Sequence, residues 1–165
     1  MKKVKSLVIA AVLFLGTNAA MAQAKTAHVN VQEIMTKMPA MLDAQKQLEK
    51  LSSTYDGEYK TMVEEYQNRI KKYEQEAATV SDKLNEERSK EVQEMQKRIV
   101  DFRDNAQKEL QKKEADLTKP IIDKVKASIA KVGKAKGYQY ILNGSELLLA
   151  DGPDITADVK KDLGF

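Results

Sequence analysis

Few side chains in this sequence could carry out chemistry. His28 is the single histidine and there is no cysteine, which gives little basis for a Ser-His-Asp triad and excludes a His-His metal site within one chain. A lone histidine in a short alternating segment is more typical of a structural side chain. Glu86 and Glu87 lie in a strongly charged helical segment, and we interpret them as solvated. The sequence therefore predicts neither a catalytic residue nor a metal site.

The segment GKAKG, from Gly133 to Gly137, has some likeness to a phosphate-binding loop. It lacks the first glycine of that motif, because Ser128 stands five residues before Gly133, and Ala135 replaces the Ser or Thr that would bind magnesium. Lysines near the end of a predicted helix suit the negative end of its dipole, and Gly137 suits a C-terminal cap. We predict the end of a helix here, and no nucleotide or other cofactor.

The N-terminus has the pattern of a secretory signal peptide. Three lysines precede an apolar run, and Ala20 and Ala22 occupy the small-residue positions of a signal-peptidase site. The apolar run from Leu7 to Leu15 is too short to span a bilayer. Without a cysteine the chain also lacks the thiol that a lipoprotein needs for acylation. Residues 1–22 are predicted to be removed after export, leaving a soluble chain that begins at Gln23.

Charge gives no support to a nucleic-acid partner. The sequence has 28 Lys and Arg against 25 Asp and Glu, but the three ionisable residues of the signal peptide are all lysines, so the mature chain is formally neutral. Between Lys119 and Lys136, six lysines accompany the single Asp123. We interpret them as a solvated helix face, and contact with an anionic surface stays open as an alternative.

Residues 39–117 have the composition of long helices, with one glycine and no proline after Pro39. Apolar residues recur there every three or four positions, which is typical of one helical face. β-branched and capping residues interrupt the pattern near 78–83. We therefore predict an antiparallel helical hairpin with its tip near 78–83, although a single continuous helix remains an alternative. The two stripes are Tyr55, Tyr59, Met62, Tyr66, Ile70, Tyr73 and Ala77, then Val92, Met95, Ile99, Phe102, Ala106 and Leu110.

An antiparallel hairpin with that tip pairs residues whose numbers add up to 161. This register places Tyr59 against Phe102, and Tyr73 against Arg88 in a cation–π contact. A two-helix seam buries only one stripe of each helix. The arm therefore needs a separate folded part of the chain, a base, to hold its two helices together.

The two ends of the mature chain supply the predicted base. The segment AHVNV alternates as a half-buried strand would, and YQYIL and ELLLA flank Asn143-Gly144, the signature of a hairpin with a type I′ turn. We predict an α+β protein in which a long antiparallel α-helical hairpin, residues 39–117, projects from a small β body, residues 23–38 and 118–165. The leucines of ELLLA are apolar on both faces of their strand, which favours contact with a partner subunit. The predicted oligomerisation residues are Val29, Val31, Ile141, Leu147 and Leu149.

Taken together, the signal peptide, the strand AHVNVQEIM, the long charged helical excursion, LLLADG and the closing DITADVKKDL resemble the Skp/OmpH family of periplasmic chaperones. The resemblance implies a periplasmic homotrimer of a Gram-negative bacterium, whose arms enclose unfolded outer-membrane proteins without ATP. The resemblance extends over the whole mature chain in the order of its segments. The match of individual residues is most specific at the two ends. Well-known members of the family are strongly basic, whereas the arm here carries 15 basic and 18 acidic residues. Contact with membrane lipid or lipopolysaccharide is therefore not carried over.

Seam residues of the arm are also the candidates for contact with a client, because tyrosine and methionine make adaptable contacts. Their simpler role is to pack the two helices against each other. A secreted structural coiled coil and a lipid-binding protein, both without chaperone activity, are the alternative functions. The candidate residues are Tyr59, Met62, Tyr66, Ile70, Tyr73, Met95, Ile99 and Phe102.

Overall fold

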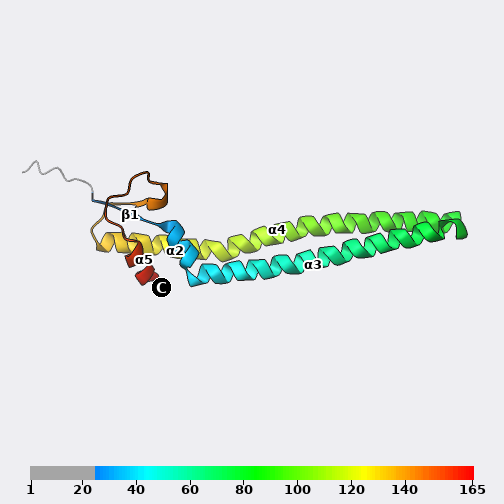
Figure 1. Ribbon diagram of the computed structural model, residues 1–165, viewed down its shortest axis with the longest axis horizontal. Coiled ribbons are helices and arrows are strands. Elements are labelled where there is room, and N and C mark those ends of the chain that lie inside the picture. The colour runs from blue at the N-terminus through cyan, green and yellow to red at the C-terminus, as the bar shows by residue number, and fades with distance from the viewer. Residues whose placement is uncertain (1–24) are drawn as a thin grey trace, which may run out of the picture.

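The computed structural model describes residues 25–165, so the predicted signal peptide lies outside the described residues. Two long antiparallel helices form an arm, and the shorter elements gather at one end of it as a small body (Figure 1). The arm consists of α3 (Pro39–Glu76) and α4 (Asp82–Ala135). The body contains β1 (Thr26–Val29), α2 (Val31–Lys37), β2 (Tyr140–Asn143), the 3-10 helix η2 (Gly144–Glu146) and α5 (Thr156–Leu163), together with the last turns of α4. The predicted α+β fold with a long helical hairpin is confirmed.

The arm turns back on itself through a short 3-10 helix, η1 (Ala77–Thr79). Val80 is extended, and the Ser81 side chain caps α4 by accepting a hydrogen bond from the backbone N–H of Leu84 at 3.3 Å. A cap of this kind starts a new helix and does not prolong the old one. The alternative of one continuous helix is therefore wrong.

Helix α4 continues past the arm into the body, through Pro120, and ends at a Schellman motif. Gly137 has a φ of +75°, its N–H donates to the Lys134 carbonyl at 3.0 Å, and the Tyr138 N–H donates to the Gly133 carbonyl at 2.9 Å. The prediction that Gly137 caps a helix is confirmed.

The two strands pair in parallel, with Thr26 opposite Tyr140 and Val29 opposite Asn143. The predicted hairpin at Asn143-Gly144 is wrong, because β2 pairs with β1 from the other end of the chain and Gly144 enters a 3-10 turn with a negative φ. The segment after this turn forms no strand in the described chain.

The strand assignment of Val31 is also wrong. The Asn30 side chain accepts a hydrogen bond from the Glu33 N–H at 2.8 Å and caps α2, so that Val31 begins a helix. An asparagine followed three residues later by a glutamate is itself a helix-start signal, and it outweighs the alternation of AHVNV.

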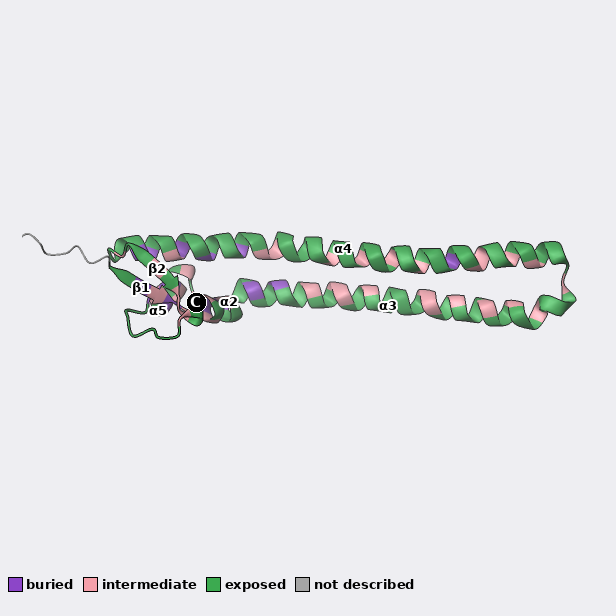
Figure 2. Cartoon of the chain, turned by 90° about the horizontal axis from the view of Figure 1, so that it is seen from above, coloured by how far each residue is buried: buried purple, intermediate pink, exposed green. Residues whose placement is uncertain are grey.

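The core lies in the body, where α5 and β2 pack on the last turns of α4, β1 pairs with β2, and α2 contacts α3 and α5. Gly133 permits the close approach of β2, because a Cβ at this position would lie 3.0 Å from Ile141 Cγ1. The buried apolar residues are Ala27, Val29, Ile34, Met38, Met41, Ala44, Ile121, Val125, Val132, Ile155 and Val159. Figure 2 shows that burial is concentrated at this end, whereas most of the arm is half-buried or exposed.

Candidate functional site

All eight predicted arm residues lie on the apolar stripes of α3 and α4. Met95 is buried, with 8% of its surface exposed, whereas Tyr59 is 39% exposed and the other six are half-buried. A pair of helices covers only part of each apolar side chain along its contact. The seam of the arm therefore leaves apolar and aromatic surface in contact with solvent over its whole length.

The register of the arm agrees with the predicted pairing near the tip and departs from it farther down. The guanidinium of Arg88 lies over the Tyr73 ring, 4.5 Å from its centroid, as predicted. Phe102, however, makes its edge-to-face contact with Tyr55, at 6.0 Å between ring centroids, one helical turn away from the predicted partner Tyr59.

Around Tyr73 and Arg88 a polar cluster joins the two helices close to the turn. Arg88 donates to Glu76 at 2.5 Å, and the Tyr73 hydroxyl donates to Glu91. Arg69 lies 3.5 Å from the same Glu91 carboxylate. The predicted antiparallel register gave one contact of this cluster, between Arg88 and Tyr73. The other contacts depend on side chains from both helices whose positions follow only from the register.

Two hollows open along the seam. The first has a volume of about 300 Å³ and the second about 390 Å³, and both open to solvent. Their apolar walls come from the seam itself, and charged and amide side chains form their edges. The first is lined by Tyr55, Asp56, Tyr59, Phe102, Arg103, Ala106, Gln107 and Leu110; the second by Ile70, Tyr73, Glu74, Ala77, Asn85, Arg88, Ser89 and Val92.

The body exposes large apolar side chains on β2 and on residues 147–152. We call residues 147–152 the strap. Leu148 is fully exposed, Leu149 is 74% exposed and Tyr140 is 60% exposed. Leu142 is also exposed. Tyr140, Leu142 and Leu148 were not among the predicted oligomerisation residues, although their position on apolar segments with the pattern of strands was a usable signal.

The predicted oligomerisation residues differ widely in exposure. Val29 is buried in the core of its own chain, Val31, Ile141 and Leu147 are half-buried, and Leu149 is exposed. Of these five side chains, Leu149 has the most surface free for a partner.

The chain after the strap is held to β1 by the backbone of His28. Its N–H donates to the Pro153 carbonyl at 2.9 Å, and its carbonyl accepts from the Ile155 N–H at 3.0 Å. The imidazole Nε2 lies 3.8 Å from Asp154 Oδ2, and the side chain is mostly buried. Burial acts to raise the pKa of Asp154, but hydrogen bonds from the Thr156 hydroxyl and N–H outweigh it and lower that pKa. His28 is thus a structural residue.

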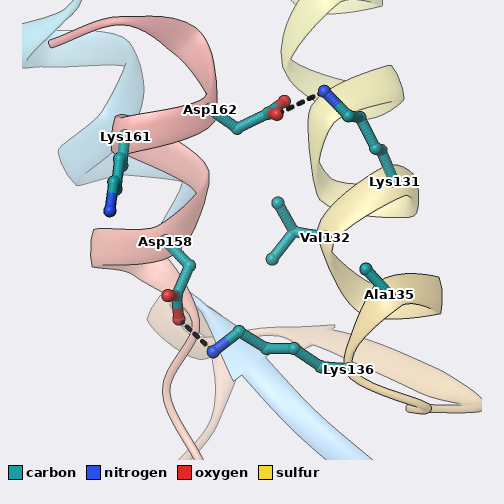
Figure 3. Close-up of a pocket in the computed structure, with 7 residues that line it drawn as sticks. All are labelled: Lys131, Val132, Ala135, Lys136, Asp158, Lys161 and Asp162. Carbon is teal, nitrogen blue, oxygen red and sulfur yellow. Dashed lines mark hydrogen bonds and ion pairs between the residues drawn. The ribbon is translucent and has the colours of Figure 1, made fainter.

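Helix α5 is fastened to α4 by two ion pairs on either side of a shallow apolar groove (Figure 3). Lys131 donates to Asp162 at 2.5 Å, and Lys136 lies 2.8 Å from Asp158. Hydrogen bonds from Lys131 and Ser128 lower the pKa of the Asp162 carboxyl, and the bond to Asp158 raises the pKa of Lys136. These groups hold α5 in place and thereby position the strap.

A third ion pair joins α5 to α2, where Lys160 donates to Glu33 at 2.6 Å. Hydrogen bonds from Lys160 and Lys37 lower the pKa of Glu33. Residues 25–165 contain no cluster of three or more side chains suited to hold a metal ion. Nor does any helix among them have the length and apolar character required to cross a bilayer.

A long two-helix arm on a small mixed body, with apolar surface exposed along its seam, defines an extended α+β protein. Its family is more specific. Residues 25–163 match the family described as outer membrane protein (OmpH-like), so the chain belongs to the OmpH-like family, and the resemblance noted from the sequence is confirmed.

Among solved structures, the chain is similar to a proposed outer membrane chaperone (OmpH-like) from Caulobacter crescentus CB15. The TM-score is 0.77 at 16% sequence identity, over 86% of this chain and 85% of the other. At this identity the likeness shows that the fold is shared. No curated protein matches the chain.

Proposed function

We propose that the protein is a holding chaperone of the periplasm, which binds unfolded outer-membrane proteins and prevents their aggregation. The observation that carries this proposal is the seam of the arm, where apolar and aromatic side chains stay half-exposed beside two open hollows. Unfolded chains expose apolar side chains and unpaired backbone groups, and a long surface with many weak contacts holds them without selecting one sequence. Family membership and the fold shared with an OmpH-like protein support the same function.

The proposed working form is a homotrimer assembled through the body. Leu148 is fully exposed and Leu149 is 74% exposed, and adjacent exposed leucines of this kind mark a surface suited to contact with another protein. The backbone N–H groups of both residues have no backbone partner within the described chain. A strand contributed by a second copy would satisfy these groups and cover the leucines at the same time. Three arms on one body would then surround a shared space for the client.

No nucleotide takes part in this proposal. The segment Gly133–Gly137 ends a helix with a Schellman motif, and its N–H groups are occupied by the helix carbonyls that a phosphate would have to displace. Release of a client would follow from the greater stability of the client once it folds in the outer membrane. The predicted signal peptide, residues 1–22, supports export to the periplasm.

The test is light scattering by a denatured outer-membrane protein diluted into buffer, with and without the mature chain and without ATP. A saturating excess of the assembled chain should suppress the rise in scattering. Unchanged aggregation would contradict the chaperone function and leave a structural coiled coil as the better account. Flotation with lipid vesicles tests the alternative of a lipid-binding protein. Such a protein would float with neutral or anionic vesicles in the absence of any client.

A further inference from the structure

The glutamines of α4 are concentrated on one side of the helix. Helix α4 has four, Gln93, Gln96, Gln107 and Gln111, separated by three, eleven and four residues. At about 100° per residue, this spacing places all four within an arc of roughly 60°. Val100 lies inside the same arc and is exposed. We call the surface formed by these five residues the glutamine face.

The amide groups of this face are exposed and have no partner. None of the four side chains donates to or accepts from another residue in the part of the chain that the structure describes. Some other amides of the arm have partners, as Gln47 donates to Asp43 at 2.8 Å and Asn85 donates to the Ala77 carbonyl at 3.0 Å. Others, such as Asn105, are free within the described chain but do not gather on one face of α4. The arm is otherwise rich in charge, so four neutral amides on one face form a distinct surface.

The glutamine face and the seam hollows lie on the same flank of the arm. Gln107 lines the first hollow together with Tyr59 and Phe102. The second hollow is lined by Ser89, which belongs to the same arc of α4 by its spacing from Gln93 and Gln96. Along this side of α4 the second hollow lies before Gln93, and the first lies between Gln96 and Gln111. The four glutamines span about 27 Å at 1.5 Å per residue.

We infer that this flank binds the main chain of an extended, unfolded polypeptide. This inference rests on the proposed function and identifies the client-facing side of the arm. A carboxamide is both a donor and an acceptor, so each glutamine matches the C=O and N–H of a peptide unit. Both groups occur in every residue of a client, while the hollows accept apolar side chains of various shapes.

The glutamine face carries no net charge, because Arg103 and Asp104, which border it between Val100 and Gln107, lie 3.7 Å apart as an ion pair. This neutrality favours a polypeptide backbone over the other occupants. A backbone amide is neutral, and a charged face would favour clients of one sign. An anionic lipid would be attracted by lysines, which the face lacks. A helix of a second copy would require a continuous apolar stripe, and Val100 is the single apolar side chain among the five residues. Contact with a second copy is thus an outcome that the experiment must be able to detect.

The first experiment is site-specific photocrosslinking in the assembled chaperone with a bound, denatured outer-membrane protein. The photoreactive residue p-benzoylphenylalanine replaces Gln96 or Gln107 on the glutamine face, or Asn105 as the matched control. Asn105 is an exposed amide on the same helix, about 200° around it from Gln107. We expect adducts with the client at Gln96 and Gln107, and few at Asn105. Equal yields at all three positions, or adducts with a second copy of the chain at Gln96 and Gln107, would overturn the inference.

The second experiment tests the amide chemistry. Gln96→Glu with Gln107→Glu removes two donors and adds two charges with little change in shape, and Gln96→Lys with Gln107→Lys adds charge of the opposite sign. Both double variants should weaken capture of the client by about tenfold. Asn105→Asp with Glu109→Gln, on the other flank, should leave capture within about twofold. If one sign of charge weakened capture and the other strengthened it, the surface would act through charge and the inference would be wrong.

The two levels of the proposal fail separately. If the unmodified chain does not suppress aggregation, the chaperone function fails. Alternatively, the chain suppresses aggregation while the glutamine face gives no crosslinks to the client and neither double variant weakens capture. In that case the chaperone function stands and the assignment of this face fails. Circular dichroism and the mass of each variant in solution confirm that the arm and the assembly are intact.

Discussion

Arg88 and Tyr73 form a cation–π contact close to the tip of the arm, with the guanidinium carbon 4.5 Å from the centroid of the ring. Around them, Arg88 donates to Glu76 and the Tyr73 hydroxyl donates to Glu91. The body core is far from this end of the molecule (Figure 1). Polar and cation–π contacts thus substitute at the tip for the apolar packing that holds α3 and α4 together near the body.

Removing the Arg88 side chain should loosen the tip without unfolding the body. We expect Arg88→Ala to lower the local stability of the turn by about 1–2 kcal/mol, because the cation–π contact and the ion pair with Glu76 are lost together. Hydrogen exchange measures this directly, as faster exchange of backbone amides between residues 74 and 88. The control is Arg98→Ala, which removes an exposed arginine of the same helix. Equal exchange rates in the two variants would contradict the prediction that Arg88 stabilises the turn at the tip of the arm.

Two glycines predict opposite effects of adding a side chain. Gly57 lies in the middle of α3, where an added Cβ would have no other atom within 4 Å, so Gly57→Ala should stabilise the arm by about 0.5–1 kcal/mol through helix propensity. At Gly133 the first side-chain atom would meet Ile141 at 3.0 Å. Gly133→Val should therefore destabilise the body by about 1–3 kcal/mol. Urea unfolding followed by circular dichroism compares the two, and a stabilised Gly133→Val variant would disprove close packing of β2 on α4.

Acid should weaken the attachment of α5. The folded state lowers the pKa of Asp162 through Lys131 and Ser128, and that of Glu33 through Lys160 and Lys37. A carboxyl whose pKa is lowered by folding contributes stability above its unfolded pKa, and this contribution is lost as the pH falls through the folded pKa. The loss should thus occur below about pH 4.

The measurement is the urea midpoint at pH 7 and at pH 3, for the natural chain and for Asp162→Asn. The variant should be less stable at pH 7 and should lose less stability on acidification. An equal drop in both proteins would assign the acid sensitivity to other carboxylates. Because Lys131 is largely exposed, salt should also weaken its ion pair with Asp162.

A charge on the strap should prevent assembly. Leu149→Asp would place an unpaired carboxylate in the proposed contact between subunits, which is strongly destabilising there. Gln67→Asp adds the same charge on the exposed side of α3 and should be tolerated. Mass in solution distinguishes the two variants, with the trimer expected for Gln67→Asp and smaller species for Leu149→Asp. An Leu149→Asp protein that remains folded with unchanged mass would show that the strap lies outside the contact.

The arm could be predicted from the sequence because the residue pattern that specifies it involves neighbours within a few positions of each other. Residues three and four apart, such as Tyr59 and Met62, lie on one face of any helix, so their spacing already indicates a seam. Ser81 marks the start of α4 through its own capping side chain. The glutamine face depends on a different property. Its residues form no apolar pattern, and its relation to the hollows follows only from how α3 and α4 are rotated against each other.

The body could be predicted only in part, because its pairings join distant segments. Asn143-Gly144 between apolar residues is a good local signal for a hairpin, but β2 finds a better partner in β1, and Gly133 lets it pack on α4. For the same reason Leu148 and Leu149 remain without a strand partner in a single chain. Their segment would gain one only from a second copy, which the sequence of one chain does not specify.

The length of the arm should determine the size of client that can be protected. Deleting Gly57–Val63 together with Arg98–Asp104 removes seven residues from each helix, or about two turns, and should keep the seam nearly in phase. This choice leaves the contacts of Arg88 and Tyr73 at the tip in place, as well as the whole body. The shortened protein should keep the number of subunits of the natural assembly, because the deletion does not touch the strap. A space walled by shorter arms encloses less chain, so aggregation of a large outer-membrane protein should be suppressed less than that of a small one. Light scattering with two clients of different size, at equal mass concentration, checks this, and the natural chain provides the reference ratio. Equal loss of protection for both clients would indicate that the deleted residues act as binding sites, and that the arms do not act as the walls of a container.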